Sequence, residues 1–358
     1  MLDLSIIIAT LNRGKLLLAT VEQVLKQRFQ NYEVWIVDQS DETVAAEIKE
    51  SLAACLSDPR VHYLHLSRKG LPNARNEGLV RAIGRVVLFL DDDVLLLEDT
   101  FLDAHLEAYI DPDVGGVTGR VIERTNRNNA RTTTNHITFG GRTVSNLTGT
   151  EPVRLHSLKG LNMSFRKEVF DHVGGFDRNY VGTALLEEAD LSTRVARDGW
   201  ALLFVPGAEV VHLSALNGGV RLESAMANEA SRFRSTAYFV SKHRGRLGLL
   251  PFGFTFGLIA IVRAIRWRRP SALLALARAA IDGRRAWRHG PDQDLGMEGL
   301  KSGPGIQANA PKPARAYPHM AYARPVQAPL SPNPDHMADR PHVTIRTAAV
   351  GTRPGQDS

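Results

Sequence analysis

Three consecutive carboxylates, Asp91, Asp92 and Asp93, directly follow the apolar run 86–90. A short unbroken run of Val, Leu and Phe predicts a strand that is covered on both faces, and open α/β sheets bind ligands beyond the carboxyl ends of their strands. Carboxylates at the first and third positions of such a turn can reach the same side and ligate Mg²⁺ or Mn²⁺, hard ions that prefer oxygen and bridge to phosphates. We therefore predict a site for a metal ion and a diphosphate at this turn.

Two further acids, Glu187 and Glu188, open a helical pattern, and a carboxylate at the start of a helix is kept ionised by the helix dipole. Such a carboxylate could accept a proton during catalysis, or it could serve only to stabilise the helix. His212 follows an apolar run and is either a metal ligand or an ordinary structural histidine.

The apolar pattern predicts the elements that position these residues. Short apolar runs and runs at helical spacing alternate along the first part of the chain, which predicts an α/β fold with a largely parallel, doubly wound sheet. The expected strands are 4–10, 34–37, 61–66, 86–90, 114–122, 201–205 and 209–213, and the expected helices lie within 17–25, 44–56, 74–83 and 177–199. The polar segment 123–151 lacks a helical period and predicts hairpins or a mobile lid.

Four motifs in this order resemble those of the family 2 inverting glycosyltransferases of GT-A fold. They are Ser5 to Arg13, Val37-Asp38, Asp91 to Asp93 and Glu187 to Leu191. The resemblance covers about residues 4 to 245. It implies a Rossmann-like, mostly parallel central sheet flanked by helices, with a nucleotide-sugar-binding half at 1–122 and an acceptor and catalytic half at 123–245.

The resemblance also implies which residues contact the donor. The turn after the first strand would hold the nucleoside, Asp38 the base or ribose, and Arg75 the nucleotide, although Asn12 could merely cap a helix and Arg75 could be a solvated surface residue. Gln39 replaces an acid that is frequent in the family. The expected nucleotide-sugar-binding residues are Thr10, Asn12, Arg13, Asp38, Arg75, Asp91, Asp92, Gly160 and Asn162.

For catalysis, the resemblance implies that Asp93 contacts Mn²⁺ or Mg²⁺, that Asp91 contacts the metal or the ribose, and that His212 completes the metal site. A divalent ion on the diphosphate stabilises the charge of the leaving group. Glu188 aligns with the usual aspartate base of the family and is longer by one methylene, so Glu187 remains a reserve candidate.

Composition limits the surroundings of the protein. The chain has 358 residues with 43% hydrophobic content, a net charge of +6 and one cysteine, Cys55, which excludes an intrachain disulfide and predicts a buried, inert thiol. The amino terminus lacks a basic region and a long apolar region, which favours the cytosol.

The segment 247–262 contains no charged residue, is shorter than the roughly 20 residues of a simple membrane span, and has basic residues on both sides. We expect 246–290 to be a basic, membrane-associated helical segment that lies in the interface of an anionic membrane rather than spanning it, with a buried core helix as the alternative. The Pro-rich tail 291–358 is expected to be disordered.

Together these features predict a glycosyltransferase that moves a sugar from a nucleotide-diphosphate sugar to a hydroxyl of a surface-polysaccharide or lipid-linked glycan acceptor. It would act at the inner face of the cell membrane, as a peripheral or monotopic protein, without binding nucleic acid. The alternatives are a phosphatase of the haloacid dehalogenase class, which also carries acids after an apolar strand, and an inactive nucleotide-sugar-binding membrane scaffold.

Overall fold

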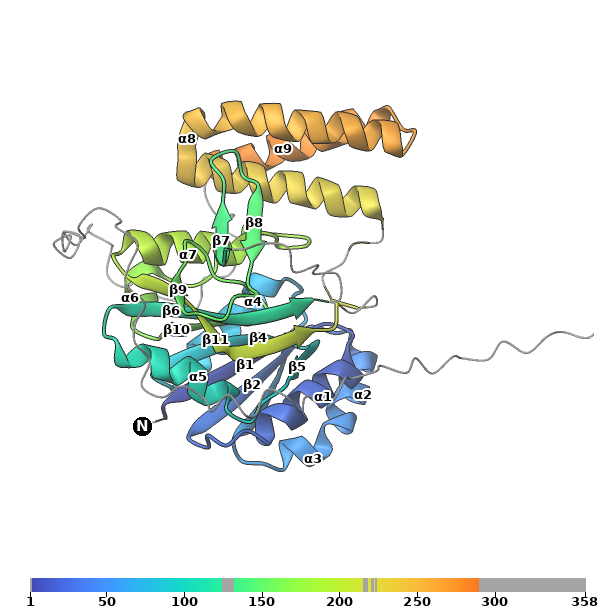
Figure 1. Ribbon diagram of the computed structural model, residues 1–358. Helices are drawn as coiled ribbons and strands as arrows, with labels where there is room; N and C mark the ends of the chain where they lie inside the picture. The colour runs from blue at the N-terminus through green and yellow to red at the C-terminus, as the bar shows by residue number, and fades with distance from the viewer. Residues whose placement is uncertain (1, 124–131, 215–217, 220–221, 223, 290–358) are drawn as a thin grey trace, which may run out of the picture. The chain divides into compact units, whose positions relative to one another are not determined.

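The structure of the protein is a computed structural model that describes residues 2–123, 132–214, 218–219, 222 and 224–289 (Figure 1). The expected disordered tail, 291–358, lies outside the described residues. The first part of the segment 123–151, up to residue 131, also lies outside them except for Glu123.

One mixed sheet forms the centre of the described chain. Its strands are β1 (Leu4–Thr10), β2 (Tyr32–Asp38), β3 (Val61–His65), β4 (Val86–Asp91), β5 (Val94–Leu96), β6 (Val114–Glu123), β9 (Val153–Arg154), β10 (Asn162–Arg166) and β11 (Ala201–His212). They are ordered β3-β2-β1-β4-β10-β6-β11-β5, with β9 paired to β11.

The strands β3, β2, β1 and β4 are mutually parallel, as the sequence predicts. In their register Thr10 lies opposite Asp38, and Ala9 lies opposite Asp91. The motifs that follow these strands therefore meet at one edge of the sheet, where open α/β sheets bind their ligands.

The second half of the sheet is not parallel throughout, so the expectation of a largely parallel sheet needs correction. Strand β10 is antiparallel to both β4 and β6, and β5 is antiparallel to β11. Strand β10 is hard to predict from the sequence, because Asn162 and Ser164 are polar residues that lie fully buried inside it. The two short strands expected at 201–213 form the single strand β11, whose register shifts between Val205 and Val210, next to Pro206.

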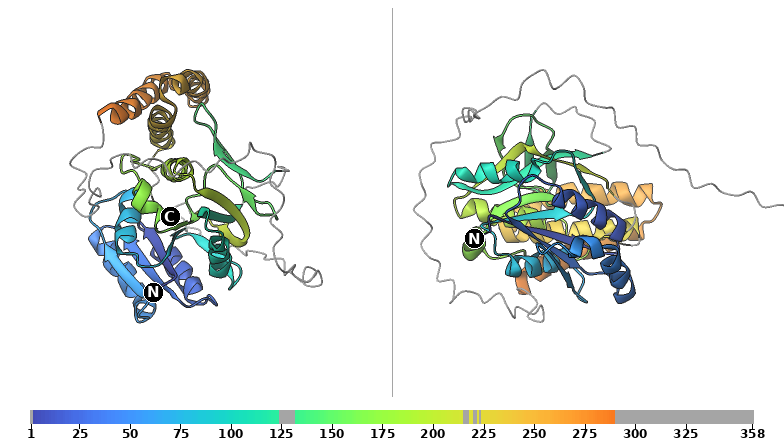
Figure 2. Two further views of the ribbon diagram at one scale, coloured as in Figure 1. Left: turned by 90° about the vertical axis from the view of Figure 1, so that its left-hand side faces the viewer. Right: turned by 90° about the horizontal axis from the view of Figure 1, so that it is seen from below.

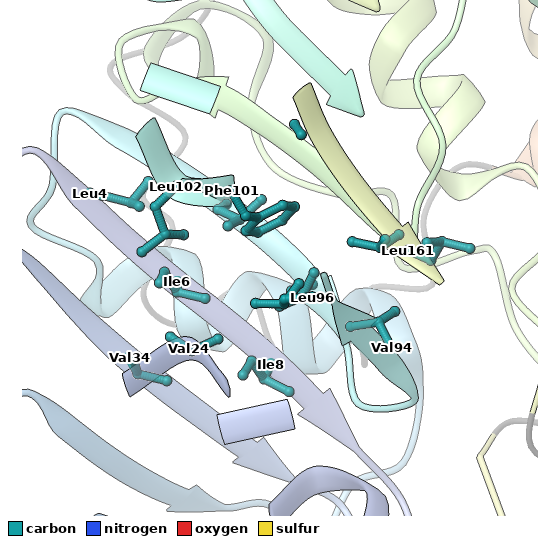
Figure 3. Packing of buried hydrophobic residues seen from close by; sticks show 14 of the residues in the cluster. Leu4, Ile6, Ile8, Val24, Val34, Val94, Leu96, Phe101, Leu102 and Leu161 are labelled. Carbon is teal, nitrogen blue, oxygen red and sulfur yellow. The ribbon is translucent and has the colours of Figure 1, made fainter. Parts of the chain in front are cut away.

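Helices cover both faces of the sheet. They are α1 (Gly14–Leu25), α2 (Glu42–Ser51), α3 (Ala53–Leu56), α4 (Leu71–Arg81), α5 (Phe101–Glu107), the 3-10 turn η1 (Ala108–Ile110), α6 (Val169–Val173), α7 (Glu187–Arg197), α8 (Ala225–Arg266) and α9 (Ser271–His289). Successive side chains of a strand point to opposite faces, so Ile6 and Ile8 of β1 join one core with Val24 and Phe101, as Figure 3 shows. Ile7 joins the other core, which α7 helps to close.

Cys55 lies in α3 and is a free, buried cysteine, as predicted. Burial raises the pKa of its thiol above the ordinary value. A buried thiol with a raised pKa forms little thiolate, so it is chemically inert.

The described part of 123–151 contains the hairpin of β7 (Thr134–Ile137) and β8 (Thr143–Asn146), which confirms the prediction of a hairpin there. Its turn packs against α8, where a side chain at Gly140 would touch the backbone of Pro251 and one at Gly141 would touch Thr236. Figure 1 shows the hairpin reaching from the sheet towards α8 and α9.

The helix α8 bends at Gly245, whose φ of 59° and ψ of −150° are not helical. Within the described residues, α8 is long and apolar enough to cross a membrane by length and composition alone, and 28% of its most apolar stretch is buried. Its two halves and α9 share a core that includes Phe233, Phe256 and Leu276. Figure 2 shows α9 lying beside α8. The same core reaches α7 through Ala189.

Candidate active site

The turn after β1 is tied to the aspartate triplet. Thr10 Oγ1 donates to Asp92 Oδ2 at 2.7 Å, and Arg13 Nη1 lies 3.0 Å from Asp92 Oδ1 and 3.1 Å from Asp93 Oδ2. Burial raises the pKa of Asp92 to about 6, even though Arg13 and Thr10 oppose that shift. Three of the expected donor-binding residues thus lie together, while the pairing of Arg13 with the triplet was not predicted.

The loops after β1 and β2 are joined through Asn12 and Asp38. Asn12 has a left-handed φ of 58°, and its backbone N–H donates to Ser40 Oγ at 2.7 Å. The buried Asp38 accepts from the Ser40 N–H at 2.8 Å and from the Tyr63 hydroxyl at 2.6 Å. The alternative that Asn12 caps a helix is wrong, because Arg13 is the N-cap residue of α1 and no side-chain cap bond is formed there.

Arg75 of α4 is buried and connects three parts of the site, so the alternative of a solvated surface arginine is wrong. Its guanidinium donates to Glu187 Oε1, to Asp91 Oδ1 at 3.1 Å and to the Gly160 carbonyl at 2.8 Å. Burial opposes the charge of Arg75, but Glu187 and Asp91 outweigh it and raise the pKa of the guanidinium. Arg75 therefore links the aspartate triplet to the acids of α7.

The two acids in the first turn of α7 have different surroundings. Glu187 is 2% exposed and is held by Arg75, and its Oε2 atom is buried without a hydrogen-bond partner among the described residues. Glu188 is half-buried, and its Cβ and Cγ lie beside Gly160, each 3.5 Å from where a Cβ on that glycine would be. Burial raises the pKa of both carboxyls, and for Glu188 the nearby Lys159 and Arg75 oppose that shift. Glu188 is therefore the more exposed of the two acids.

The end of β11 brings His212 to the triplet. His212 Nε2 lies 3.5 Å from Asp93 Oδ1, and its Nδ1 lies 3.9 Å from Glu123 Oε1. Burial lowers the pKa of His212, but the hydrogen bond and charge of Asp93 outweigh it, so the pKa is raised. Sequence reasoning missed Glu123, which pairs with His212 in the register of β6 and β11 and whose only signal was its place at the end of an apolar run.

The expected metal ligands come together only in part. Asp93 and His212 are neighbours, whereas Asp91 points to Arg75. Within the described residues no group of three His, Cys, Asp or Glu side chains is arranged to hold a metal ion. The carboxylate oxygen of Asp93 and the imidazole nitrogen of His212 are nevertheless donor types that a divalent ion accepts, and Mg²⁺ is commonly bound by one or two carboxylates plus substrate phosphates.

The last two expected donor-binding residues, Gly160 and Asn162, lie in different places. Gly160 lies between Arg75 and Glu188, inside the site. The fully buried Asn162 instead donates through Nδ2 to the Ala208 carbonyl at 2.9 Å, and its Oδ1 accepts from His105 Nε2 at 2.9 Å. Both ends of the Asn162 amide are therefore engaged inside the protein, so the structure places this residue in the interior and not beside the acids.

A second charged cluster, which sequence reasoning missed, holds α7 against α8. Asp190 is fully buried and lies 2.7 Å from His243 Nε2, 2.7 Å from Lys242 Nζ and 2.9 Å from Arg194 Nε. Burial would raise the pKa of Asp190, but the hydrogen bond from His243 and the charges of Arg194 and Lys242 outweigh it and hold the pKa far below its usual range. Its only signal in the sequence was its place two residues after Glu188.

With this geometry in hand, comparison with known proteins assigns the domain. Residues 5–174 match the family described as Glycosyl transferase family 2. The match to glycosyl transferase family 2 is therefore carried by residues 5–174, and the rest of the chain lies outside it. The match spans β1 to β10 and includes the aspartate triplet and Arg75, and it ends before the acids of α7.

Individual relatives agree with this family. An uncharacterized glycosyltransferase of Rickettsia felis is 36% identical over 95 residues, 26% of this chain and 15% of that protein. The N-acetylglucosaminyl-diphospho-decaprenol L-rhamnosyltransferase of Mycobacterium tuberculosis is 34% identical over 89 residues, 25% of this chain and 27% of that protein. The matched stretch therefore spans less than a third of either relative.

A solved structure shows the fold. The mannosyltransferase PcManGT of Pyrobaculum calidifontis, in complex with GDP-Man and Mn²⁺, superposes with a TM-score of 0.51 and 20% identity. The superposition covers 78% of this chain and 75% of that chain. The fold of this chain is therefore of the GT-A type, as the sequence predicted.

Proposed function

We propose that this protein is a metal-dependent inverting glycosyltransferase that moves a sugar from a nucleotide-diphosphate sugar to a hydroxyl of a surface-polysaccharide or lipid-linked glycan. The observation that carries the proposal is the chain of contacts from the aspartate triplet through Arg75 to the acid pair of α7. It places groups suited to a diphosphate and a proton acceptor in one site. The lipid-linked acceptor named for the mycobacterial relative supports the acceptor class.

Glu188 is the base in this proposal. As the acceptor oxygen attacks C1 of the sugar, its proton passes to the Glu188 carboxylate, and the C1–O bond to the diphosphate breaks on the opposite face. Glu188 suits this role because it is half-buried and not locked in an ion pair, whereas Glu187 is held by Arg75. Glu187 then acts as a positioning residue that orients Arg75.

The donor site is formed by the loops after β1, β2 and β4. Thr10, Asn12 and Arg13 lie on the first of these loops, and the buried Asp38 fixes the second through its bonds to Ser40 and Tyr63. The guanidinium of Arg75 can present further donors to the nucleotide or phosphate once the donor enters. A donor role for Asn162 stays a prediction from the sequence.

The metal would be Mn²⁺ or Mg²⁺, held by Asp93 and His212 with Asp91 as the third candidate. The ion would stabilise the negative charge on the departing diphosphate. Support comes from the 3.5 Å approach of Asp93 and His212 and from the Mn²⁺ in the complex of the Pyrobaculum mannosyltransferase.

A membrane-facing surface is proposed on the second half of α8. Its apolar side chains fall on two sides of the helix: Phe252, Phe256, Ala260 and Ala264 are buried against the rest of the protein. The opposite side is exposed and consists of Leu247, Leu250, Phe254, Leu258, Ile261, Val262 and Ile265. The ring of Phe256 meets the ring of Phe233 edge-on, with 5.0 Å between the ring centres. The apolar second half of α8 therefore packs against the first half, which carries charged residues.

This arrangement favours a helix that lies in the interface of a membrane with its apolar side down. The exposed arginines Arg266, Arg268 and Arg269 follow the apolar side and would meet anionic headgroups. The proposed location is therefore the cytoplasmic face of the cell membrane, where the acceptor would be carried by a lipid.

A donor screen tests the proposal. Purified full-length protein is incubated with Mn²⁺ or Mg²⁺, membrane lipid extract and UDP-, dTDP- or GDP-sugars, and release of nucleoside diphosphate is measured. We expect metal-dependent release with one donor class, and release should require the extract. No release with any donor would contradict the enzyme assignment.

Two variants separate the roles, and an exposed residue supplies the control. Asp93→Ala should lose metal-dependent donor binding, whereas Glu188→Gln should bind donor and lose transfer. Glu47→Gln, on the exposed side of α2, should behave as the wild type. Phosphate release from a phosphomonoester without sugar transfer would instead favour the phosphatase, and donor binding without turnover would favour the scaffold.

A further inference from the structure

A cavity of about 240 Å³ lies apart from the donor loops, between the β7–β8 hairpin, α7 and α8. Three of the residues that line it carry basic groups, namely His136 of β7, His156 after β9 and Arg244 of α8. Liquid water occupies about 30 Å³ per molecule, so the cavity has room for about eight waters or for a group of the size of a diphosphate. Among the residues that the structure describes, no carboxylate lines it.

We call this cavity the basic cavity. Its basic side chains have hydrogen-bond donors that can face a ligand. Arg244 Nε is buried without a hydrogen-bond partner, and within the described residues no carboxylate pairs with this guanidinium. His156 contacts His136 ring to ring at 6.4 Å, and no hydrogen bond of His156 is found in the described part of the chain. An imidazole can donate an N–H whether it is neutral or protonated, and a guanidinium offers a planar set of five donors. His156 is exposed, and His136 Nδ1 lies 3.0 Å from Thr134 Oγ1, so the buried donor without an acceptor is Arg244 Nε, and such a donor indicates an anionic ligand.

The position of the basic cavity relates it to the proposed base. Thr193, which also lines it, lies five residues after Glu188 on α7, about 7.5 Å along the helix axis at 1.5 Å per residue. An anionic group bound in the basic cavity would therefore lie against the same helix that carries Glu188.

Apolar side chains adjoin the basic cavity on the side of α8. The guanidinium of Arg244 lies 5.7 Å from the ring centre of Phe139, which is 50% exposed. Gly140, the next residue of the hairpin turn, packs against Pro251 of α8. Leu250, which precedes Pro251, is 76% exposed. A ligand with an anionic head and an apolar tail would meet donors in the cavity and apolar surface outside it.

We propose that the basic cavity binds the phosphate or diphosphate of an isoprenoid-type lipid whose sugar is the acceptor. This inference rests on the proposed function and adds to it the site that holds the acceptor. Arg244 is the main donor, His136 and His156 are supporting donors, and the lipid tail follows Phe139 and the exposed side of α8.

Binding of a soluble probe tests the inference directly. Titration calorimetry with farnesyl diphosphate and full-length protein is done in EDTA, so that metal-dependent binding at the donor loops does not contribute. Loss of a charged hydrogen bond costs about 1.5–3 kcal/mol, so Arg244→Gln should weaken binding about 10- to 100-fold. The double variant His136→Asn/His156→Asn should weaken it as well, and Arg244→Lys should restore part of the affinity.

Arg246→Gln is the matched control, because Arg246 is an exposed arginine of the same helix outside the basic cavity. We expect it to bind within about twofold of the wild type. Unchanged binding in both cavity variants, or equal weakening by Arg246→Gln, would overturn the inference. Inorganic pyrophosphate that binds as tightly as farnesyl diphosphate would refute the lipid part, and full displacement by phosphatidylglycerol vesicles would assign the cavity to ordinary membrane headgroups instead.

The donor side is measured separately in the same variants. Nucleotide-sugar binding with Mn²⁺ should be unchanged in Arg244→Gln, and the KM for the lipid acceptor should rise at least tenfold. Absence of donor binding in the wild type would remove the proposed function, whereas normal donor binding with unaltered acceptor KM in Arg244→Gln would remove only the basic cavity as the acceptor site.

Discussion

The clearest quantitative expectation concerns Asp190, which joins α7 to α8. Replacing it by Asn keeps the shape of the side chain and removes the charge. In the wild type this carboxylate faces Lys242, His243 and Arg194, and no part of it reaches solvent. His243 accepts from Arg197 through Nδ1 at 3.1 Å, so its Nε2 carries the hydrogen that it donates to Asp190.

The size of the effect follows from these contacts. Removing one partner of a buried ion pair costs about 3–5 kcal/mol. Lys242 keeps a second carboxylate, Asp177 at 2.6 Å, and Arg194 keeps the Gly175 carbonyl at 2.8 Å, so the lower end, about 3 kcal/mol, applies to Asp190→Asn. At about 2–4 °C per kcal/mol, the midpoint of thermal unfolding should fall by about 6–12 °C.

The dependence on pH has a definite sign. The pKa of Asp190 is held below that of an unfolded aspartate, about 3.9, so its ionisation stabilises the folded state fully above that pH. The contribution is lost as the pH falls below about 4 and through the folded pKa. The difference in midpoint between the wild type and Asp190→Asn should therefore be constant from pH 8 to pH 5 and shrink in stronger acid.

Circular dichroism melts of both proteins across this pH range measure the effect, with Asp171→Asn on the exposed side of α6 as the control. The control should shift the midpoint by less than about 2 °C, because exposed substitutions change stability by roughly 0.5 kcal/mol or less. An Asp190→Asn protein that melts with the wild type, or a difference that grows in acid, would refute the reasoning.

Four further results are expected. Glu188→Gln should reduce transfer by about 10²–10⁴-fold with donor affinity unchanged, and full activity would move the base to Glu187. Because burial raises the pKa of Glu188 and a base acts when deprotonated, wild-type kcat should climb with pH through a value above the ordinary carboxylate range, and a rate flat from pH 4 to pH 8 would contradict this. Arg75→Lys should lower kcat, since an ammonium cannot keep the three contacts of the guanidinium, and unchanged kinetics would show that the link is not needed. Replacing the exposed arginines 266, 268 and 269 by Ser should release the protein from anionic vesicles in a sedimentation assay, while binding as strong as the wild type would remove the electrostatic attachment.

The sequence by itself determined the first four parallel strands and the chemistry of the residues that follow them. Apolar runs bounded by polar residues are local signals, and β1 was predicted with the bounds that the structure gives it. The aspartate triplet at the end of β4 and the acid pair at the start of α7 were readable for the same reason, because a motif that ends one strand or begins one helix needs no knowledge of distant residues.

Only the tertiary structure decided how these residues are used. The partners of Arg75 lie 16, 85 and 112 positions away, so nothing local could distinguish a buried link from a surface arginine. The contact with Arg75 also distinguishes Glu187 from Glu188, and other long-range contacts, with His105 and Ala208, hold Asn162 in the interior. Pairing across a sheet and packing between helices depend on which segments are neighbours in space. The periodicity of the sequence does not indicate which distant segments those are.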